Sequence, residues 1–289
     1  MNGKILVTGS AGFIGRALMW RLAGPAIPYD VADDRHQDVR TLAVLHAMRR
    51  CEAVIHLAGE TGARDCNAHP GRAQSTNDTG TFNVLRAANA ARIGRVIVAS
   101  AASVERCASV YGWSLHVAEQ WCQMARELWG LEVTVLRLAN VYGPGSLHKT
   151  SVIAKWMKQL LLRQPMNLKV WGGFQLRDFT YVDDVAEVIE RRLHDPLAWD
   201  DEPWHYVGTN TLTSTLDLAH LLLATGRRAG ATCCNIGVQV EHGPEERQPV
   251  LPVHRDARFA CTTALEDGLV RTWEYFMAHA AELQAGTAA

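Results

Sequence analysis

The sequence predicts an α/β fold in which a doubly wound parallel sheet is followed by a smaller C-terminal lobe. Over the first half of the 289 residues, short runs of apolar and β-branched residues alternate with longer stretches of helical pattern. This order is typical of a parallel sheet with helices on both faces. A glycine-rich turn stands directly after the first run. The alternation stops after residues 143–145, so the remaining residues are expected to form a second, smaller unit.

Five strands are expected in the first half, at residues 5–8, 27–30, 53–57, 96–99 and 133–138. Each run is mostly apolar, as expected of strands that are buried on both faces. Between the runs, helical patterns begin near Gly12, Thr41, Arg72 and Ser114, and the last one ends at Gly130. These repeats predict a doubly wound sheet that occupies residues 1–145.

The second half is expected to be a smaller lobe at residues 146–289. Its pattern predicts a helix at 151–163, a strand at 168–171, helices at 183–194 and 213–224, a loop-rich stretch at 234–252 and a last helix at 263–284. Part of the 170–210 region is expected to rejoin the first domain. Because open α/β sheets bind ligands at the carboxyl ends of their strands, we expect this lobe to hold the substrate there.

Composition and charge argue against several classes of partner. The chain has 29 Lys+Arg, 30 Asp+Glu and a pI near 6.9, a balance that gives no electrostatic footprint for nucleic acid or an anionic membrane. Its seven cysteines include no CxxC pair, so neither a disulfide framework nor a metal site is expected. No apolar run has the length of a signal peptide core or a membrane span. We therefore expect a cytoplasmic protein without bound metal.

The first expected strand leads directly into GSAGFIG at residues 9–15, a G-x-x-G-x-x-G turn that opens a helix. Gly9 permits the tight turn, Gly12 lets the backbone approach a pyrophosphate, and Gly15 allows the helix to pack closely on the strand. The first turn of the helix supplies N–H donors and positive potential. At the first βα junction of an alternating chain, this pattern predicts the dinucleotide-binding turn of a Rossmann-type domain.

Asp30 ends the second expected strand, where an acidic side chain can accept both hydroxyls of the adenosine ribose and repel a 2′-phosphate. This position favours NAD over NADP as the cofactor. Asp33 and Asp34 are alternatives for the same role. Arg35 stands beside them, and its positive charge would weaken the discrimination against a 2′-phosphate. A solvated, charged turn is the other interpretation of this segment.

Six short segments, spread over most of the chain, form a further pattern. In chain order they are TGSAGFIG at 8–15, QDVR at 37–40, HLAG at 56–59, NDTGT at 77–81, RLANVYGPG at 137–145 and RDFTYVDDVA at 177–186. Together they resemble the extended short-chain dehydrogenases/reductases of the NAD-dependent epimerase/dehydratase type, most of which act on nucleotide sugars. The resemblance implies a Rossmann-type fold with a substrate lobe, NAD as cofactor, a nucleotide sugar as substrate and a possible homodimer.

The resemblance also implies roles for individual residues. Those assigned to the cofactor are Gly9, Gly12, Phe13, Ile14 and Gly15 in the first turn, Asp38 and Val39 beside the adenine, Leu57, Ala58 and Gly59 under the adenosine and phosphates, and Ala139 and Val141 at the nicotinamide. Asn140 and Arg177 are assigned to the sugar nucleotide, with the guanidinium at its diphosphate. An ion pair between Arg177 and Asp178 is the alternative. Asn77 is expected to tie the central helix to the sheet.

The catalytic segment departs from the family, which uses Tyr-x-x-x-Lys at a helix start. The matching run is YGWSLHVAE at 111–119, so Tyr111 is kept and the lysine position holds Leu115. The chain has only five lysines, at positions 4, 149, 155, 158 and 169. An isobutyl group neither binds the ribose nor stabilises a phenolate. A tyrosine near its ordinary pKa of about 10 is a poor base at neutral pH.

The family also places a catalytic serine or threonine after the fourth strand, where this chain has Ala101. Ser100 and Ser103 flank that position and are the candidates to replace the hydroxyl. Satisfying the backbone of an irregular loop is the alternative role for Ser103. Dehydrating and decarboxylating members carry acidic residues next, whereas this chain has Ala102 and Ser103. Those two chemistries are therefore disfavoured.

These features predict an NAD-dependent epimerase or reductase that acts on a nucleotide-linked sugar or a similar polyol, with Tyr111 as the proton-transfer residue. Two alternatives stay open. Ala101 and Leu115 suggest a catalytically silent dinucleotide-binding or partner protein. The third hypothesis is a non-redox enzyme on the same fold, in which the cofactor is structural.

Overall fold

The structure is a computed structural model that describes residues 3–22, 26–162, 168–171, 175–194, 204–230, 236–241 and 257–286. The chain forms two compact units. The first comprises Met1–Leu138, Val185–Val207 and Asp256–Phe259, and the second comprises Ala139–Asp184, Gly208–Arg255 and Ala260–Ala289. Helix α8 (Val182–His194) begins in the second unit and continues in the first. A substrate role for the second unit stays a prediction.

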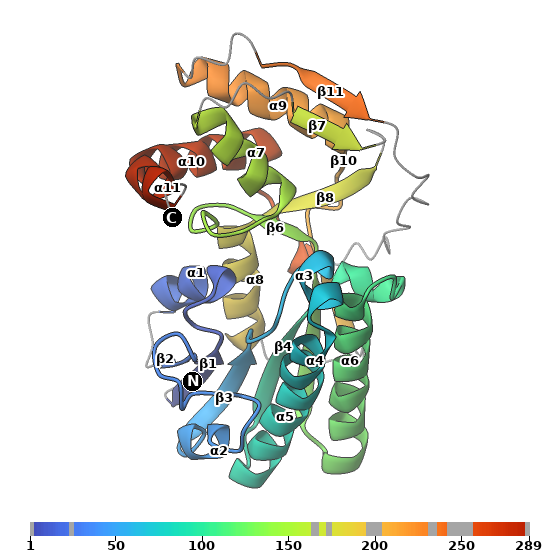
Figure 1. Cartoon of the computed structure of the whole chain (residues 1–289). Helices are drawn as coiled ribbons and strands as arrows, with labels where there is room; N and C mark the ends of the chain where they lie inside the picture. Colours follow the sequence, from blue (N-terminus) through green and yellow to red (C-terminus); the bar gives the residue numbers. More distant parts are fainter. Residues whose placement is uncertain are drawn as a thin grey trace. The chain divides into compact units, whose positions relative to one another are not determined.

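A six-stranded parallel sheet forms the centre of the first unit (Figure 1). In spatial order its strands are β2 (Ala26–Tyr29), β1 (Lys4–Thr8), β3 (Cys51–His56), β4 (Arg95–Ala101), β5 (Glu132–Leu138) and β9 (Trp204–Val207). The predicted fold class and its five strands are confirmed, and β9 adds a sixth strand from a later segment. The strand order changes direction between β1 and β3, and open α/β sheets bind ligands at such a switch point.

Helices cover both faces of this sheet. Those of the first unit, besides α8, are α1 (Phe13–Arg21), α2 (Val44–Ala47), α3 (Ala63–Ala68), α4 (Pro70–Ala73), α5 (Gly80–Ala91) and α6 (Val110–Trp129). On one face, Val44, Leu85 and Ala125 of α2, α5 and α6 share a buried cluster with Leu6 and Val96 of the strands. Because apolar side chains are buried on both faces, the strands have apolar sequences throughout.

The other face carries α1 and the part of α8 that belongs to the first unit. Arg21 of α1 forms an ion pair with Glu190 of α8, with 2.7 Å between Nε and Oε2. Arg192 of α8 donates to Thr134 Oγ1 of β5 at 2.9 Å. Side chains alternate along a strand, so Thr134 points away from the face that holds its neighbours Val133 and Val135.

Three helix starts differ from the expected ones. α6 begins at Val110 rather than near Ser114, because Ser109 caps it and accepts from the Gly112 N–H. The helix expected from Thr41 is the single turn α2. The helix expected near Arg72 begins at Pro70, and a π-helical turn (Gln74–Thr79) joins α4 to α5.

The second unit contains two small sheets and four helices in its described parts. One sheet has the order β10 (Leu212–Ser214), β8 (Leu176–Tyr181), β6 (Asn140–Tyr142), and the other pairs β11 (Val238–Glu241) with β7 (Leu168–Trp171). The helices are α7 (Val152–Leu161), α9 (Thr215–Arg228), α10 (Leu265–Ala278) and α11 (Ala280–Gly286). Met157, Leu222 and Phe276 lie at the centre of its core.

Two segments of this unit differ in detail from the expected pattern. The stretch 234–252, expected to be loop-rich, contains β11, whose residues pair in parallel with β7. The single helix expected at 263–284 is interrupted at His279. Residues 242–250 and Arg163, at the end of another expected helix, lie outside the described residues.

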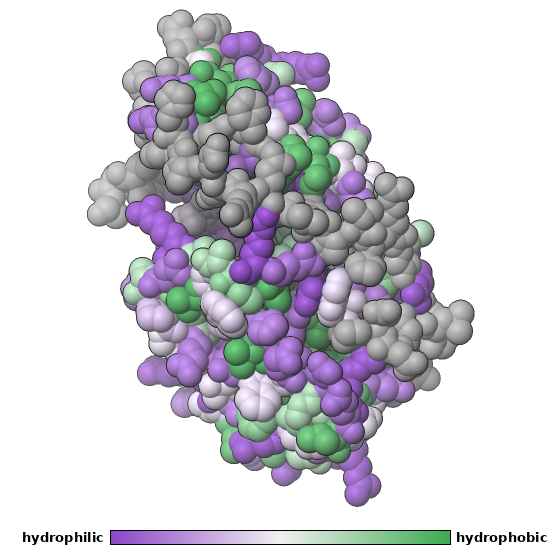
Figure 2. Space-filling model, turned by 90° about the vertical axis from the view of Figure 1, so that its right-hand side faces the viewer, coloured by the Kyte–Doolittle hydropathy of each residue, from purple (hydrophilic) through white to green (hydrophobic). Residues whose placement is uncertain are grey.

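The surface drawn in Figure 2 is mixed, with hydrophilic residues around small groups of hydrophobic ones. Exposed large hydrophobic residues of the first unit include Trp20, Trp113 and Leu128. None of the helices in the described ranges combines the length and the apolar character that crossing a bilayer requires.

Candidate cofactor and catalytic site

At two positions of the turn after β1, no residue larger than glycine fits. Gly9 has a φ of +72°, and a Cβ on it would lie 2.5 Å from the backbone nitrogen of Ala58. A Cβ on Gly15 would collide with the backbone of Gly9. The first turn of α1 therefore lies against the end of β1, and the chain after β3 passes close to Gly9.

The start of α1 is the second feature of this turn. Gly12 precedes the helix, and Phe13 and Ile14 are its first two residues. Within the described part of the chain, no side chain caps this helix start. Its first N–H groups have no partner inside the helix, and such groups together with the helix dipole bind pyrophosphate in many nucleotide-binding proteins.

Asp30 lies directly beside the glycine turn. Its Oδ2 accepts from the Ala11 N–H at 3.1 Å, and its Oδ1 accepts from the Ala32 N–H at 2.9 Å. The alternatives Asp33 and Asp34 are exposed on the loop that follows. Each carboxylate oxygen of Asp30 still has a lone pair for a hydroxyl donor. Of these three acidic residues, Asp30 is the one whose carboxylate contacts the backbone of the turn.

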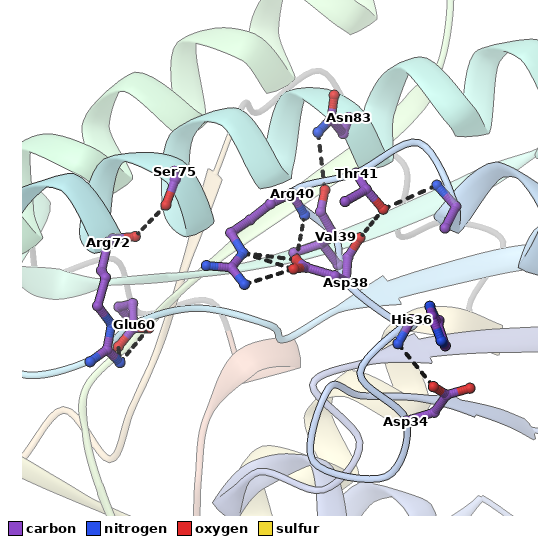
Figure 3. A network of polar contacts seen from close by, with 11 residues as sticks. Asp34, His36, Asp38, Val39, Arg40, Thr41, Glu60, Arg72, Ser75 and Asn83 are labelled. Carbon is purple, nitrogen blue, oxygen red and sulfur yellow. Dashed lines mark hydrogen bonds and ion pairs between the residues drawn. The ribbon is translucent and has the colours of Figure 1, made fainter.

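Asp38 is held by a two-pronged ion pair with Arg40 (Figure 3). Arg40 Nε lies 2.9 Å from Oδ1, and Nη2 lies 2.7 Å from Oδ2. These hydrogen bonds to Arg40 hold the pKa of Asp38 below its ordinary value. The next residue, Val39, is buried, and its carbonyl accepts from Asn83 of α5 at 3.1 Å. The segment predicted to flank the adenine is therefore fixed from both sides.

The loop after β3 carries Leu57, Ala58 and Gly59 and is fixed by Asn77. Asn77 is 1% exposed, accepts from the Glu60 N–H at 2.8 Å and donates to the Glu60 carbonyl at 3.1 Å. A Cβ on Gly59 would lie 3.1 Å from Asn77 Oδ1. These bonds tie the helical segment at Asn77 to the loop that follows β3, rather than to a strand of the sheet as expected.

The same loop is anchored by an ion pair on its outer side. Arg72 donates to Glu60 with 2.8 Å between Nη2 and Oε1, as Figure 3 shows. The Arg72 side chain is exposed and that of Glu60 is partly exposed, and ion pairs so open to solvent contribute little stability. The pair nevertheless connects the loop to α4.

His56 joins the ends of β1 and β3. One ring nitrogen, Nδ1, lies 2.7 Å from Thr8 Oγ1, and the other, Nε2, lies 3.1 Å from Thr81 Oγ1. Burial lowers the pKa of His56 to about 4, so the ring is neutral at physiological pH. The two strand ends that meet at the switch point are thus linked by a buried hydrogen bond.

Tyr111 lies in the first turn of α6, and Leu115 and Glu119 follow at four-residue spacing on the same face of the helix. Burial, together with the nearby Cys66, raises the pKa of Tyr111 to about 12. The phenol therefore stays protonated at neutral pH, as expected of a tyrosine without the lysine, and its pKa lies above the ordinary value. Leu115 is 8% exposed and brings no charge to the phenol.

Ser100, at the end of β4, is 6% exposed, and its hydroxyl donates to Glu119 Oε1 at 2.6 Å. Glu119 also accepts from Arg137 Nη2 at 2.6 Å, and the Arg137 guanidinium lies 3.8 Å from the centre of the Trp204 ring. Ser103 is exposed on the turn after β4. Ser100 thus belongs to a buried ionic network, which the sequence analysis missed because its members are far apart in the chain. Catalytic roles for the two serines stay predictions.

The residues assigned to the sugar nucleotide lie in the second unit. Asn140 is exposed on β6, and its Nδ2 donates to the Asp178 carbonyl of β8 at 3.1 Å. Arg177 is the preceding residue of β8, and its Nη1 donates to the Leu176 carbonyl at 3.0 Å. The pairing of β6 with β8 sets Asn140 opposite Phe179, two residues after Arg177 on the same strand. Ala139 and Val141 flank Asn140 and are half-buried.

The first unit fits a dinucleotide on two independent observations. The turn at Gly9 and Gly15 leaves a backbone cradle that any Cβ would fill, and the Asp30 carboxylate is bonded to that cradle. Among the described residues, no three His, Cys, Asp or Glu side chains are grouped so that they could hold a metal ion.

Comparisons with known proteins agree with this geometry. The family model described as "NAD dependent epimerase/dehydratase family" matches residues 5–207. A UDP-glucuronate 4-epimerase of Thermodesulfobacterium geofontis is 28% identical over 231 residues, which cover 64% of this chain and 69% of that protein.

Two solved structures show the same fold. The UDP-glucose 4-epimerase of Thermotoga maritima, solved with UDP-glucose, has a TM-score of 0.82 at 24% identity and covers 96% of this chain and 99% of its own. A variant UDP-glucuronic acid 4-epimerase of Bacillus cereus, solved with a fluorinated UDP-sugar and NAD, has a TM-score of 0.81 at 21% identity, with coverage of 96% and 99%.

Proposed function

Since this chain belongs to the NAD dependent epimerase/dehydratase family, we propose that it binds NAD and transfers hydride to or from a nucleotide-linked sugar, with Tyr111 as the proton-transfer residue. The observation that carries the proposal is the side-chain-free turn at Gly9 and Gly15, whose backbone is bonded to Asp30. The predicted family and its cofactor, NAD, agree with the family that the chain matches.

The residues of the first unit suit successive parts of the cofactor. The uncapped first turn of α1 suits the pyrophosphate, and Asp30 suits the adenosine ribose. Asp38, held by Arg40, and Val39 suit the adenine, with the loop at residues 57–59 beneath it. Outside this unit, we assign Ala139 and Val141 of the second unit to the nicotinamide. When bound, NAD supplies the acceptor and donor of hydride.

Tyr111 moves the proton that accompanies the hydride. Because burial raises the pKa of Tyr111 to about 12, the phenol is protonated at neutral pH and can donate to a substrate oxygen when a ketone is reduced. When an alcohol is oxidised, the phenol must first be ionised, and at pH 7 only about one molecule in 100,000 is. Oxidation should therefore accelerate about tenfold with each unit of pH, whereas reduction should not depend on pH below about 12.

The second unit and the relatives support a proposal for the substrate class. A guanidinium matches the oxygens of a diphosphate better than a carboxamide or an ammonium does, so we assign Arg177 to the diphosphate and Asn140 to the same nucleotide. The curated relatives at 28% identity are named as UDP-sugar 4-epimerases. We propose a nucleotide sugar as the substrate, and either epimerisation or ketone reduction as the reaction.

A catalytically silent NAD-binding protein is the second candidate. Leu115 supplies no ammonium, Ala101 supplies no hydroxyl, and the Ser100 hydroxyl is bonded to Glu119. Each of these features weakens the chemistry, and Leu115 also lacks the ribose contact of a lysine, whereas the glycine turn and Asp30 stay available to bind NAD.

The two candidates are separated by NAD binding and turnover measured on the same purified samples. Turnover with a panel of nucleotide sugars is followed by nicotinamide absorbance and product analysis. Tyr111→Phe should lower turnover about 100-fold or more, the usual contribution of a proton-transfer residue. Tyr275→Phe, on α10 of the second unit, is the matched control and should leave turnover unchanged.

Each outcome decides between the hypotheses. Equal turnover of Tyr111→Phe and the unmodified protein would exclude Tyr111 as the proton-transfer residue. NAD binding without turnover, combined with activity gained in Leu115→Lys but not in the size-matched Leu115→Met, would establish the silent binder. A protein that binds no dinucleotide would refute both.

A further inference from the structure

The start of α6 depends on a side chain from a distant helix. The first N–H groups of a helix have no acceptor within it. The Gly112 N–H donates to Ser109 Oγ at 3.2 Å, which is an ordinary cap from the neighbouring residue. The Val110 N–H instead donates at 2.9 Å to Asn67 Oδ1, which lies on α3, 43 positions earlier. This bond ties α3 to the residue that directly precedes Tyr111.

The backbone carbonyl of Tyr111 is fixed as well. It accepts from Ser114 Oγ at 2.9 Å, and that same Oγ accepts from Asn77 Nδ2 at 2.9 Å. Asn77 also bonds the N–H and the carbonyl of Glu60. A chain of hydrogen bonds thus runs from the loop after β3 to the carbonyl of Tyr111. The Asn67 bond completes this arrangement on the N-terminal side.

α3 also influences the phenol through Cys66. Cys66, the neighbour of Asn67, is 2% exposed and lies close enough to Tyr111 to contribute to its raised pKa. The segment that carries α3 is held at its base, because Glu60 is bonded by Asn77 and paired with Arg72. Movement of α3 would therefore displace both the backbone and the surroundings of Tyr111.

We propose that Asn67 is a positioning residue for Tyr111: its hydrogen bond to the Val110 N–H fixes the first turn of α6 and thereby the place of the phenol. The proposal rests on the proton-transfer role proposed above. At position 115 a lysine could anchor this turn by a side chain, whereas Leu115 cannot. Bonds to the backbone, from Asn67 on one side and Ser114 on the other, hold the tyrosine instead.

The test measures the position of the phenol separately from activity. The chain has six tyrosines, and ¹³C at their ζ carbons gives one resonance for each, with that of Tyr111 assigned by its loss in Tyr111→Phe. Spectra, thermal melts, NAD affinity and kcat are recorded for Asn67→Ala and Asn67→Asp. Asn89→Ala, an exposed asparagine of α5, is the control.

Asn67→Ala should shift or broaden the Tyr111 resonance and lower kcat about fivefold, as expected for the loss of one hydrogen bond, with NAD affinity changed by less than about twofold. Asn67→Asp keeps an acceptor for the Val110 N–H and should restore both readouts. Asn89→Ala should change neither.

An unchanged Tyr111 resonance and unchanged kcat in Asn67→Ala would overturn the proposal, as would Asn67→Asp behaving like Asn67→Ala. Should Asn67→Ala fail to fold, Asn67→Ser takes its place, because a serine hydroxyl is too short to make the same bond. If Tyr111→Phe keeps full activity, the proposed function fails, and the resonance alone then decides the role of Asn67.

Discussion

Leu115→Lys tests how the helix that carries Tyr111 controls its proton. The substitution places an ammonium one turn after the phenol, and side chains at that spacing lie about 6 Å apart. At an effective dielectric constant of about 20, a charge at that distance stabilises a phenolate by about 2.8 kcal/mol, or about two pH units. The pKa of Tyr111, which burial raises to about 12, should fall to about 10.

The assay is the initial rate of substrate oxidation at saturating NAD, measured from about pH 6 to pH 10. For the unmodified protein, the logarithm of the rate should rise with a slope of one over the whole range, because the phenol loses its proton only near pH 12. Leu115→Lys should begin to level off near pH 10. Its ionised fraction at pH 7 should be about 100-fold higher, although the rate gains less because a more acidic phenol is a weaker base.

Leu115→Met controls for the change in side-chain shape and should keep the profile of the unmodified protein. A plateau of the oxidation rate near neutral pH in the unmodified protein would contradict this prediction, because Tyr111 would then ionise without a neighbouring ammonium. The prediction would also be refuted if Leu115→Lys left the profile unchanged.

His56 should make the free energy of unfolding depend on pH. Burial lowers the pKa of His56 from about 6.5 to about 4. Below pH 6.5 the unfolded chain therefore binds a proton that the folded chain does not. Urea titrations should therefore give about 2 kcal/mol less stability at pH 5 than at pH 7, and His56→Gln should remove most of this difference. Arg40→Gln breaks the two-pronged bond to Asp38 and should weaken NAD binding about tenfold in calorimetric titrations, while Arg40→Lys, which keeps the charge but not the fork, should recover only part of it. Asp30→Asn removes the charge that repels a 2′-phosphate and should lower the ratio of NADP to NAD dissociation constants about tenfold; an unchanged ratio would exclude Asp30 as the selecting residue.

Features encoded locally could be predicted from the sequence. The five strands of the first half are short apolar runs, and the turn at residues 9–15 needs glycine for reasons that neighbouring residues set. Hydrophobic periodicity predicts the start of α6 near Ser114, four residues later than its observed start at Val110. Ser109, a favoured capping residue directly before Val110, is the local signal in the sequence that marks the true start.

Features that depend on distant segments could not be predicted. The sequence favoured Asp30 but left Asp33 and Asp34 as alternatives, and the bond from the Ala11 N–H distinguishes Asp30 from them. The raised pKa of Tyr111 reflects burial and a cysteine 45 positions earlier on α3. No motif marks Asn67, because its importance comes from the approach of α3 to α6. Strand β9 likewise exists because it pairs with β5 across the sequence.

The measurement that tests the central claim most directly is calorimetric titration of NAD into the purified chain and into Gly15→Ala, with the fold of each verified by circular dichroism. A Cβ at position 15 would collide with the Gly9 backbone and close the cradle. The account predicts one NAD bound for each unmodified chain and a loss of binding of about 100-fold or more in a folded Gly15→Ala. Absence of NAD binding to the unmodified chain, or equal binding to both proteins, would contradict it.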